Sequence, residues 1–482
     1  MIFCSFLFWY YDDNVRLVKN MIYEEDTIAA IASGCTDSGI GVIRLSGKHA
    51  LNIVEKVFVP KKEGIKLSEM KSYTAHYGFI VNPSDKKKID ECIILYMKGP
   101  HSYTGEDVVE IDAHGGSFVC NRILRILLEN GARLAEPGEY TKRAFLNGRM
   151  DLTQAEAVMD VIHADNEYAL KISMNQLSGK LKDKIISIRN QIIHENAYIE
   201  YALDDPEHVS LDGFSDKLLL LVNDMIEDIN DLLRHADDGK LLKEGIKTAI
   251  VGRPNAGKSS LLNALLREER AIVTDIPGTT RDTLEEHITI EGIPFHMIDT
   301  AGIHDTEDIV EKIGVDKAKN VIINADLILY IIDSSNEFKE EDEKIIELIK
   351  DKNVIVLLNK SDLEQKMDEN RIKNMLNAPI LSISIKKEEG LKEFYDIIKE
   401  MFFHGEITVK EGAMISNERQ RLEISNALES LMKVKESIEL SMSEDFYTID
   451  LMDAYEYLGN VIGESVHDDL VNQIFEEFCT GK

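Results

Sequence analysis

The chain has 482 residues, a length that suggests about three domains. Hydrophobic residues make up 44% of it and charged residues 29%, which is a globular composition and excludes a disordered chain or a membrane protein. Acidic residues number 87 and basic residues 55, so the formal net charge is −32. This balance argues against a broad surface that wraps a nucleic acid, but it leaves room for a local basic site or a basic partner.

Five cysteines, an odd number, are spread along the chain, and none of them forms a Cys-x-x-Cys pair. Their spacing therefore predicts neither a disulfide framework nor a zinc knuckle. We expect the reducing cytoplasm as the compartment. The five positions are Cys4, Cys35, Cys92, Cys120 and Cys479.

The apolar start of the chain, Ile2–Tyr11, is its one signal-like stretch. It lacks a preceding basic segment and a small-residue cleavage site, so we do not interpret it as a signal peptide. The sequence contains no run of about 18 apolar residues that would span a membrane. We interpret residues 1–20 as an upstream extension and Met21 as the natural start, with a hydrophobic anchor as the alternative.

Residues 21–147 have the pattern of a mixed α/β domain. A helix is predicted at Phe118–Glu129, where apolar residues recur at helical spacing and Asn130-Gly131 provides a C-cap. A glycine-containing turn is expected between Gly34 and Gly39. The predicted strands are Thr27–Ala32, Gly41–Leu45, Cys92–Met97 and Val108–Asp112.

Residues 148–243 change to long amphipathic helices. One apolar stripe at helical spacing runs from Leu177 to Ile199 and another from Leu218 to Leu232. The segment Leu203–Pro206 breaks the pattern between them. Packing against other helices is the expected role of both stripes.

Residues 244–403 alternate short β-branched runs with helical stretches, which predicts a sheet rich in parallel strands. Residues 404–482 are helical again, so we expect one helical domain into which the α/β domain is inserted. The strand candidates of the α/β domain are Thr248–Val251, His287–Ile290, Phe295–Asp299, Leu327–Asp333, Val354–Asn359 and Pro379–Ser384.

A phosphate-binding loop is predicted at Gly252–Ser259, which fits the pattern G-x-x-x-x-G-K-[ST]. The motif follows a predicted strand and precedes a helical run at Ser260–Leu266, which is the context it requires. Glycines allow backbone N–H groups to turn toward phosphates, Lys258 can reach the β and γ oxygens, and the Ser259 hydroxyl can ligate Mg²⁺.

Further elements follow in the order expected of a guanine-nucleotide-binding domain. Asp299–Gly302 ends a strand, where an aspartate can hold the water shell of Mg²⁺, and a hydroxyl of Thr279-Thr280 can complete that shell. The aspartate of Asn359-Lys360-Ser361-Asp362 can accept both N–H donors of guanine, which adenine does not offer. Ser384-Ile385-Lys386 ends the next strand and is expected to contact the base oxygen.

The residue that orients the attacking water is less obvious. Many small GTPases place a glutamine directly after Asp-Thr-Ala-Gly, but this chain has Ile303 there. Glu311 is the best candidate for orienting the water, and the alternative is that it is only a solvent-exposed carboxylate on a helix. No arginine finger is evident in the sequence. Asn255 and the segment Thr274–Thr280 offer oxygens for a monovalent cation, which could take over the finger's electrostatic role at the oxygen between the β- and γ-phosphates of GTP.

Several motifs lie outside the nucleotide elements: Gly39–Gly47 (GIGVIRLSG), Thr104–Glu110 (TGEDVVE), Pro137–Tyr140 (PGEY), Arg143–Arg149 (RAFLNGR) and Phe478–Lys482 (FCTGK). Together with Gly252–Ser259 and Asp299–Gly302, they make the chain from Met21 to Lys482 resemble the tRNA uridine-modifying GTPase family MnmE (TrmE). The resemblance implies an N-terminal folate-binding domain that dimerises, followed by a GTPase domain inserted into a discontinuous helical domain.

The resemblance also implies residue roles in GTP hydrolysis. Two GTPase domains of a homodimer would meet across K⁺, Glu311 would orient the water, and Ser259 and Thr280 would hold Mg²⁺. The K⁺ ligands would be Asn255, Thr274, Ile276 and Thr279. The GTP contacts would be Asn255, Ala256, Gly257, Lys258, Ser259, Ser260, Thr274, Asp275, Ile276, Pro277, Gly278, Thr279, Thr280, Asp299, Thr300, Ala301, Gly302, Asn359, Lys360, Asp362, Ser384, Ile385 and Lys386.

For the folate site, the resemblance implies contacts from Arg44, Glu110, Arg149 and Lys482 to a 5-formyl- or methylene-tetrahydrofolate. A carboxylate can grip the N–C–N edge of a pterin, and an arginine can pair with the glutamate tail. Taken alone, each of these residues is more typical of a surface ion pair.

The C-terminal cysteine, Cys479, would be required for tRNA modification through its thiol chemistry. The chain departs from the family pattern at Thr480, where isoleucine is more usual, and at His304, where arginine can stand. Thr480 puts the family's packing of the C-terminal tail in doubt. His304 puts in doubt a contact of the loop that follows Asp299–Gly302.

The function implied is a GTPase that, with an FAD-containing partner (MnmG, also called GidA) in a heterotetramer, adds a carboxymethylaminomethyl-type group to C5 of the wobble uridine of certain tRNAs. The partner would carry most of the tRNA contact, although Lys142-Arg143 offers a local basic patch. Two alternatives stay open. A ribosome-assembly GTPase switch would need an RNA-binding appendage that the sequence does not show, and a stand-alone folate-dependent transferase would act without the flavoprotein.

Overall fold

The computed structural model describes residues 26–34, 37–234, 236–267, 286–290, 293–298, 322–403 and 412–464, together with Val471, Ile474, Phe475, Phe478 and Gly481. The chain divides into two compact units. The first consists of residues up to Met159 and residues from Ile462 onward, and the second is Asp160–Val461. Within the described ranges, we find no helix long and apolar enough to cross a bilayer.

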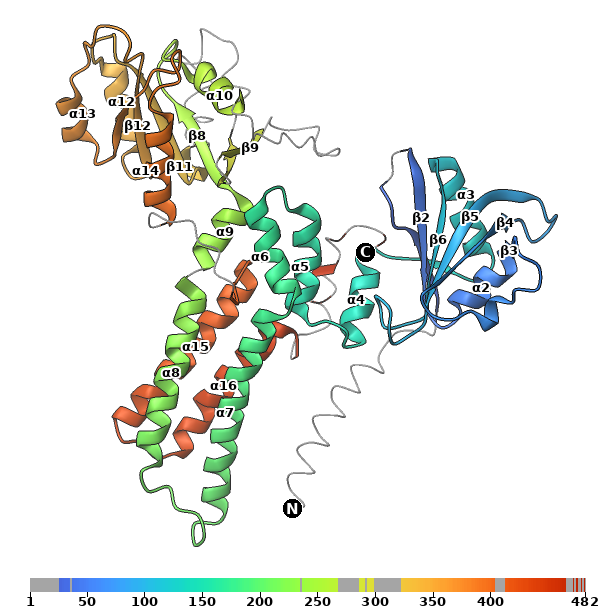
Figure 1. Cartoon of the computed structure of the whole chain (residues 1–482). Helices are drawn as coiled ribbons and strands as arrows, with labels where there is room; N and C mark the ends of the chain where they lie inside the picture. Colours follow the sequence, from blue (N-terminus) through green and yellow to red (C-terminus); the bar gives the residue numbers. More distant parts are fainter. Residues whose placement is uncertain are drawn as a thin grey trace. The chain divides into compact units, whose positions relative to one another are not determined.

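The first unit contains a seven-stranded sheet in the order β3-β4-β5-β6-β2-β1-β7, in which only the β1–β7 pair is parallel. Helices α2 (Ala50–Val57) and α3 (Ser117–Glu129) bury their apolar faces with residues of this sheet in one core (Figure 1). The strands are β1 (Ile28–Ile31), β2 (Ser38–Ser46), β3 (Phe58–Pro60), β4 (Thr74–Val81), β5 (Lys88–Met97), β6 (Val108–Gly115) and β7 (Arg133–Leu134).

The four strands and the helix predicted for this region are confirmed, but two strands begin earlier than predicted. β2 starts at Ser38 and β5 at Lys88. The sequence prediction missed these starts because none of the first residues of either strand is buried and they lack the apolar alternation that marks a buried strand. α3 ends where the sequence predicts, since the Asn130 N–H donates to the Ile126 carbonyl and Gly131 adopts a φ of +117°. The sequence prediction did not include α2, β3, β4 and β7.

A second core of the first unit joins distant parts of the chain. Helices α4 (Glu139–Leu146) and α5 (Leu152–His163) contribute residues to it, and so does the C-terminal segment through Val471, Phe475 and Phe478. Gly138 is required where these segments meet, because a Cβ atom there would lie 2.5 Å from the Phe475 carbonyl oxygen and the φ is +67°. The C-terminal residues therefore pack against α4.

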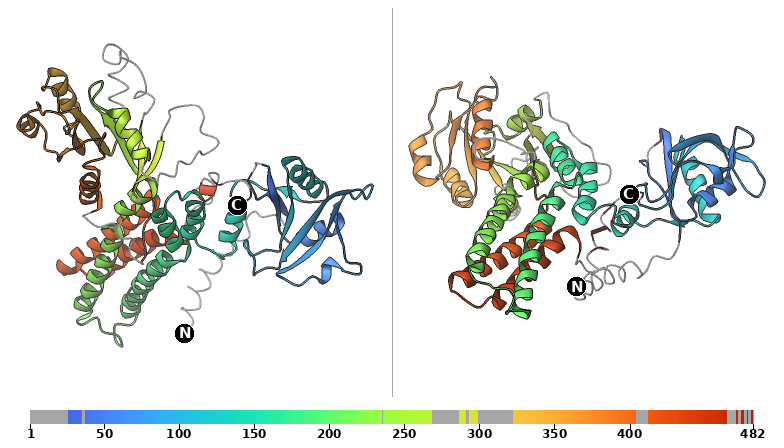
Figure 2. Two further views of the ribbon diagram at one scale, coloured as in Figure 1. Left: turned by 45° about the horizontal axis from the view of Figure 1, so that its top comes forward. Right: turned by 60° about the horizontal axis from the view of Figure 1, so that its bottom comes forward.

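The second unit contains a bundle of long helices (Figures 1 and 2). Its helices α7 (Lys180–Asp204) and α8 (Phe214–Arg234) precede the α/β segment, and α15 (Glu418–Glu439) and α16 (Asp445–Ile462) follow it. α8 contacts α15, and the Arg189 Nε of α7 donates to the Tyr455 carbonyl of α16 at 3.2 Å. Helices on both sides of the α/β segment thus pack together.

The first predicted apolar stripe is divided between two helices. Leu177 ends α6 (Glu167–Leu177), and the other stripe residues from Leu181 onward belong to α7. Gly179 causes the break, because its left-handed conformation (φ +86°) cannot continue a helix. The second stripe lies in α8, where its apolar residues are buried.

The α/β segment forms a six-stranded sheet in the order β13-β12-β11-β8-β10-β9. All neighbouring strands are parallel except the β9–β10 pair, which confirms the predicted parallel-rich sheet. The strands are β8 (Ile246–Val251), β9 (Glu286–Ile290), β10 (Ile293–Met297), β11 (Leu327–Asp333), β12 (Val354–Asn359) and β13 (Ile380–Ser382).

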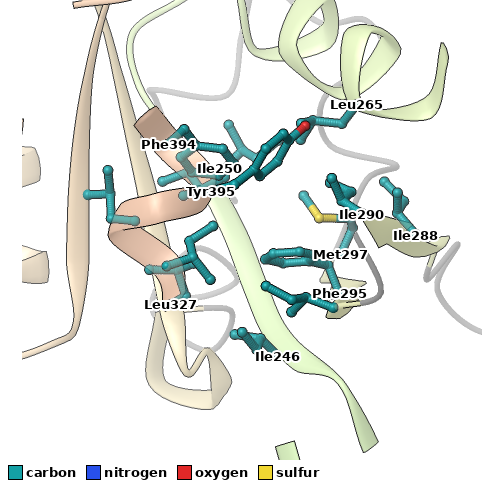
Figure 3. Close-up of a cluster of buried hydrophobic side chains, with 14 of the residues drawn as sticks. Ile246, Ile250, Leu265, Ile288, Ile290, Phe295, Met297, Leu327, Phe394 and Tyr395 are labelled. Carbon is teal, nitrogen blue, oxygen red and sulfur yellow. The ribbon is translucent and has the colours of Figure 1, made fainter. Parts of the chain in front are cut away.

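Two cores cover the two faces of this sheet, because successive side chains of a strand point to opposite sides. On one face, α10 (Lys258–Arg267) and α14 (Leu391–Phe403) pack with Leu327, Leu329 and Ile331 of β11. Figure 3 shows part of this core, including Leu265 of α10 and Phe394 of α14. On the other face, α12 (Glu340–Ile349) and α13 (Glu369–Met375) pack with Ile328, Tyr330 and Ile332 of the same strand.

Candidate functional site

The predicted phosphate loop connects β8 to α10. Gly252 has a φ of +156° and Gly257 a φ of +110°, and Asn255 between them lies in the left-handed region at +62°. A Cβ atom on Gly252 would lie 2.3 Å from the Ile331 carbonyl oxygen of β11. Glycine is required for this close approach, and the loop consequently turns tightly at the carboxyl edge of the sheet.

Lys258, the first residue of α10, folds back over the loop. Its Nζ donates to the carbonyl oxygens of Gly252 and Arg253 at 2.9 and 3.0 Å. Burial lowers the pKa of Lys258, because the charged amine loses solvation. An anion at the N-terminus of α10 is favoured by the helix dipole and would also satisfy this amine, which suits a phosphate.

The two predicted guanine-contacting motifs lie beside the loop. Asn359, at the end of β12, donates from Nδ2 to the Ala256 carbonyl at 2.9 Å and accepts from the Ile385 N–H at 3.3 Å. Ser384 Oγ donates to Asp362 Oδ1 at 2.8 Å, and this hydrogen bond lowers the pKa of Asp362. The carboxylate is therefore ionised at neutral pH and ready to accept the N–H donors of a guanine base.

Asp333 is a residue of this region that the sequence prediction missed as a site residue. Lys360 has a φ of +63°, and its Nζ pairs with Asp333 Oδ2 at 2.6 Å and donates to the Asn255 carbonyl at 3.3 Å. Asp333 is the last residue of β11 and is paired with Asn359 in the parallel ladder. Its position at a strand end, next to the strand that carries Asn359, was the signal that could have identified it.

The remaining predicted nucleotide residues divide into three groups, and the first is Lys386 alone, in the turn that follows Ser384. Ser259 and Ser260 lie in the first turn of α10. The residues Thr274, Asp275, Ile276, Pro277, Gly278, Thr279, Thr280, Asp299, Thr300, Ala301, Gly302 and Glu311 lie outside the described residues, and so does His304.

The predicted folate-contacting residues of the first unit lie close together. Arg44 of β2 and Glu110 of β6 face each other in the antiparallel ladder, and Arg44 Nη2 lies 2.7 Å from Glu110 Oε1. The Arg44 guanidinium lies 5.5 Å from the ring centroid of Tyr103, and the Arg149 guanidinium lies 5.2 Å from the same ring. Two cations, a carboxylate and an aromatic ring therefore meet at one place.

Two tyrosines complete this cluster and were not predicted as site residues. The Tyr103 hydroxyl shares a hydrogen bond with Thr141 Oγ1 at 2.8 Å, and burial raises the pKa of Tyr103. The Tyr140 hydroxyl donates to the Arg44 carbonyl at 2.7 Å, and the Arg44 guanidinium lies 5.7 Å from the Tyr140 ring. Tyr140 belongs to the PGEY motif, which was the available sequence signal.

The C-terminal tail reaches this cluster through Gly481. Arg44 Nη1 donates to the Gly481 carbonyl at 3.4 Å. A Cβ atom on Gly481 would lie 2.6 Å from the Ile31 carbonyl oxygen, so only glycine fits against β1 here. The described residues do not include the predicted site residues Cys479 and Lys482. They also do not include Thr480, where the chain departs from the family pattern.

The structure removes Arg143 from the local basic patch that the sequence left open at Lys142-Arg143. The Arg143 side chain is only 3% exposed and its guanidinium pairs with carboxylates of Asp26, Glu106 and Glu139. Glu139 lies one turn earlier in α4, and the other two carboxylates come from distant segments that fold over the helix. Arg143 is thus a buried structural cation, and no phosphate backbone can reach it.

Sequence comparisons identify the family. The family model for the MnmE helical domain matches residues 152–479, more than half of the chain, and the model for the N-terminus of GTP-binding protein TrmE matches residues 27–149. The tRNA modification GTPase MnmE of Lachnoclostridium phytofermentans is 52% identical over 457 residues, which cover 95% of this chain and 99% of that protein. The chain belongs to the MnmE family of tRNA modification GTPases.

A second curated relative agrees with this family membership. The MnmE protein of Alkaliphilus oremlandii is 45% identical and is covered completely, with 96% of this chain aligned. Among solved structures, the G domain of the T. maritima FeoB iron transporter is 29% identical, with 32% of this chain and 97% of that one covered and a TM-score of 0.26. The resemblance to the MnmE family is confirmed, and the protein is a GTPase that acts in tRNA modification, with GTP as its substrate.

Proposed function

We propose that this MnmE-family GTPase works with an FAD-containing protein of the MnmG (GidA) type to add a carboxymethylaminomethyl-type group to C5 of the wobble uridine of certain tRNAs. GTP hydrolysis drives a conformational change in this scheme and a tetrahydrofolate provides the one-carbon unit. The observation that carries the proposal is the meeting of Arg44, Glu110 and Arg149 beside Gly481, two residues from Cys479. We place the reaction in the cytoplasm.

The proposed domain organisation has a GTPase domain at 244–403, inserted between helical segments at 148–243 and 404–482. The folate-binding and dimerisation domain is 21–147. Contacts at the two ends of the inserted domain support this division. Lys243 Nζ pairs with Asp160 Oδ1 at 2.7 Å, and Ser416 Oγ donates to Gln176 Oε1 at 2.7 Å, so the segments that lead into and out of the domain are fastened to the same helical region.

In the proposed nucleotide site, the loop Asn255–Ser260 surrounds the phosphates and Asp362 binds the base. Lys258 provides the positive charge at the N-terminus of α10, and Ser259 and Thr280 are the proposed Mg²⁺ ligands. The remaining contacts are those predicted from the sequence at residues 274–280, 299–302, 359–360 and 384–386. The geometry of Lys258, Asn359 and Asp362 described above supports this assignment.

A monovalent cation is proposed between two GTPase domains of a homodimer, with Asn255, Thr274, Ile276 and Thr279 as its ligands. Asn255 is exposed on the phosphate loop while its carbonyl is held by Lys360, so its side chain is accessible at a fixed point of the backbone. A cation beside the β–γ bridge stabilises negative charge that develops there during hydrolysis. Glu311 is the proposed group that orients the attacking water.

The donor set of the first unit fits a reduced folate. Glu110 retains acceptor positions besides its bond to Arg44, the flat Tyr103 ring can stack on a pterin, and Arg149 or Lys482 can pair with the glutamate tail. When bound, the tetrahydrofolate supplies the one-carbon unit for the modification. Arg44 orients Glu110 across the strand pair, and Cys479, two residues before Gly481 in the sequence, is the proposed thiol.

Nucleoside analysis of wobble uridines tests this proposal in cells that lack the protein. We expect the modified uridine to be lost in the deletion strain and restored by the parent chain. Glu110→Gln and Cys479→Ser should not restore it, although both proteins should retain GTP hydrolysis. Normal wobble uridines in the deletion strain would refute the proposed function, and restoration by both variants would refute the folate pocket.

The cation and water-orienting roles are tested separately with purified protein. GTP turnover should be faster in KCl than in NaCl at equal ionic strength. Equal rates in the two salts would refute the proposed cation site. Glu311→Ala should bind GTP but hydrolyse it much more slowly, because the water loses its acceptor. Near-normal turnover in that variant would assign the role to another residue.

A further inference from the structure

Asp342, on the first turn of α12, is a buried carboxylate that belongs to none of the nucleotide motifs. Its side chain is 1% exposed and accepts from three groups. The Tyr330 hydroxyl donates to Oδ1 at 3.0 Å, and the Lys339 backbone N–H donates to Oδ2 at 3.0 Å. The third group is Arg253 of the phosphate loop, whose Nε lies 3.2 Å from Oδ1.

Arg253 supplies the charge that this carboxylate needs. A buried ionised group is stable only when it is paired and hydrogen-bonded, and the Arg253 side chain is itself only 11% exposed. The N-terminus of α12 adds a favourable partial positive charge. Removal of either partner would leave the other charge buried and uncompensated, so the side chain of Arg253 is held firmly against α12.

The backbone of Arg253 lies at the centre of the hydrogen bonds within the loop. Its carbonyl accepts from the Ala256 N–H at 3.3 Å and from Lys258 Nζ at 3.0 Å. The preceding residue, Gly252, sits against Ile331, the neighbour of Tyr330 on β11. A single residue therefore connects α12 and β11 to the part of the loop that sets the direction of the Lys258 amine.

We propose that Asp342 is a positioning residue for GTP hydrolysis, which holds Arg253 and thereby fixes the first turn of the phosphate loop. The side chain of Asp342 is buried against Tyr330, Lys339 and Arg253, so we expect it to act on the reaction through the loop. Transition-state stabilisation depends on the placement of donors more steeply than ground-state binding does, because displacements of about 1 Å can cost on the order of 100-fold in rate.

The test compares Asp342→Asn with Glu341→Gln in the full-length chain. The first variant keeps the shape and an acceptor but loses the charge that pairs with Arg253, and the second neutralises the exposed neighbour on the same helix. Single-turnover GTP hydrolysis and the affinity for a fluorescent GDP are measured at a temperature where circular dichroism shows both proteins folded. We expect turnover to fall about tenfold or more in the first variant, GDP affinity to change much less, and the control to match the parent.

Two further variants separate positioning from stability. Tyr330→Phe removes a hydrogen bond from Asp342 but leaves the ion pair, so it should lower the melting temperature and keep turnover within about twofold of the parent. The double variant Asp342→Asn with Arg253→Met has no uncompensated buried charge and should fold, yet turn over as slowly as the single variant. The proposal would be overturned if either protein that lacks Asp342 hydrolysed GTP as fast as the parent. It would also be overturned if Tyr330→Phe slowed GTP hydrolysis as much as Asp342→Asn does.

Discussion

Arg143 should contribute several kcal/mol to the stability of the first unit, and Arg143→Met tests this. The guanidinium lies 2.6 Å from Asp26, 3.1 Å from Glu106 and 2.9 Å from Glu139, and both Arg143 and Glu139 are 3% exposed. Removing one partner of a buried ion pair costs about 3–5 kcal/mol. Because Arg133 also pairs with Asp26 and Glu139, at 2.6 Å each, we expect the low end of this range, about 3 kcal/mol.

For a unit of this size, about 3 kcal/mol corresponds to a fall in melting temperature of roughly 6–12 °C. Differential scanning calorimetry measures the fall, and hydrogen exchange of peptides from β1 and α4 shows whether it arises in this unit. Arg125→Met is the matched control, because Arg125 pairs with Glu129 at 3.1 Å but is 72% exposed, and such pairs contribute about 0–1 kcal/mol. If both variants lose the same stability, the buried network does not stabilise the fold as argued.

The remaining predictions concern pH, the phosphate loop and the base pocket. Burial raises the pKa of Glu139, but hydrogen bonds to Arg133, to the Glu136 N–H and to Arg143 outweigh it, so the folded pKa lies below the ordinary value. The stabilising effect of ionised Glu139 is then complete above about pH 5 and is lost as the pH falls through the folded pKa. Urea titrations from pH 6 to pH 3 should therefore show that the free energy of unfolding falls less steeply with pH for Arg143→Met than for the parent. Gly252→Ala should abolish binding of fluorescent GDP, because its Cβ would lie 2.3 Å from a backbone oxygen that cannot move aside; binding within threefold of the parent would contradict this geometry. Ser384→Ala should weaken GDP binding severalfold, since Asp362 loses the donor that lowers its pKa and orients it, and an unchanged dissociation constant would exclude that role.

The nucleotide-binding part of the chain was largely predictable from its sequence. Buried parallel strands are continuous apolar runs, and the predicted ranges Leu327–Asp333 and Val354–Asn359 coincide with β11 and β12. The phosphate loop is contiguous in the sequence, and its glycines directly indicate a tight turn. Each of these features depends on residues that are close together along the chain, which is the range over which a sequence pattern carries information.

The tertiary structure alone decided which distant charges meet. Arg44 and Glu110 face each other because β2 pairs with β6 in one register, and Gly481 joins them from the far end of the chain. Arg143 has the sequence appearance of a surface cation, yet two of its three carboxylates, Asp26 and Glu106, come from distant segments that only the fold brings to α4. Burial and ion pairing depend on packing across tens to hundreds of residues, so no local spacing could have distinguished a buried pair from a solvated one.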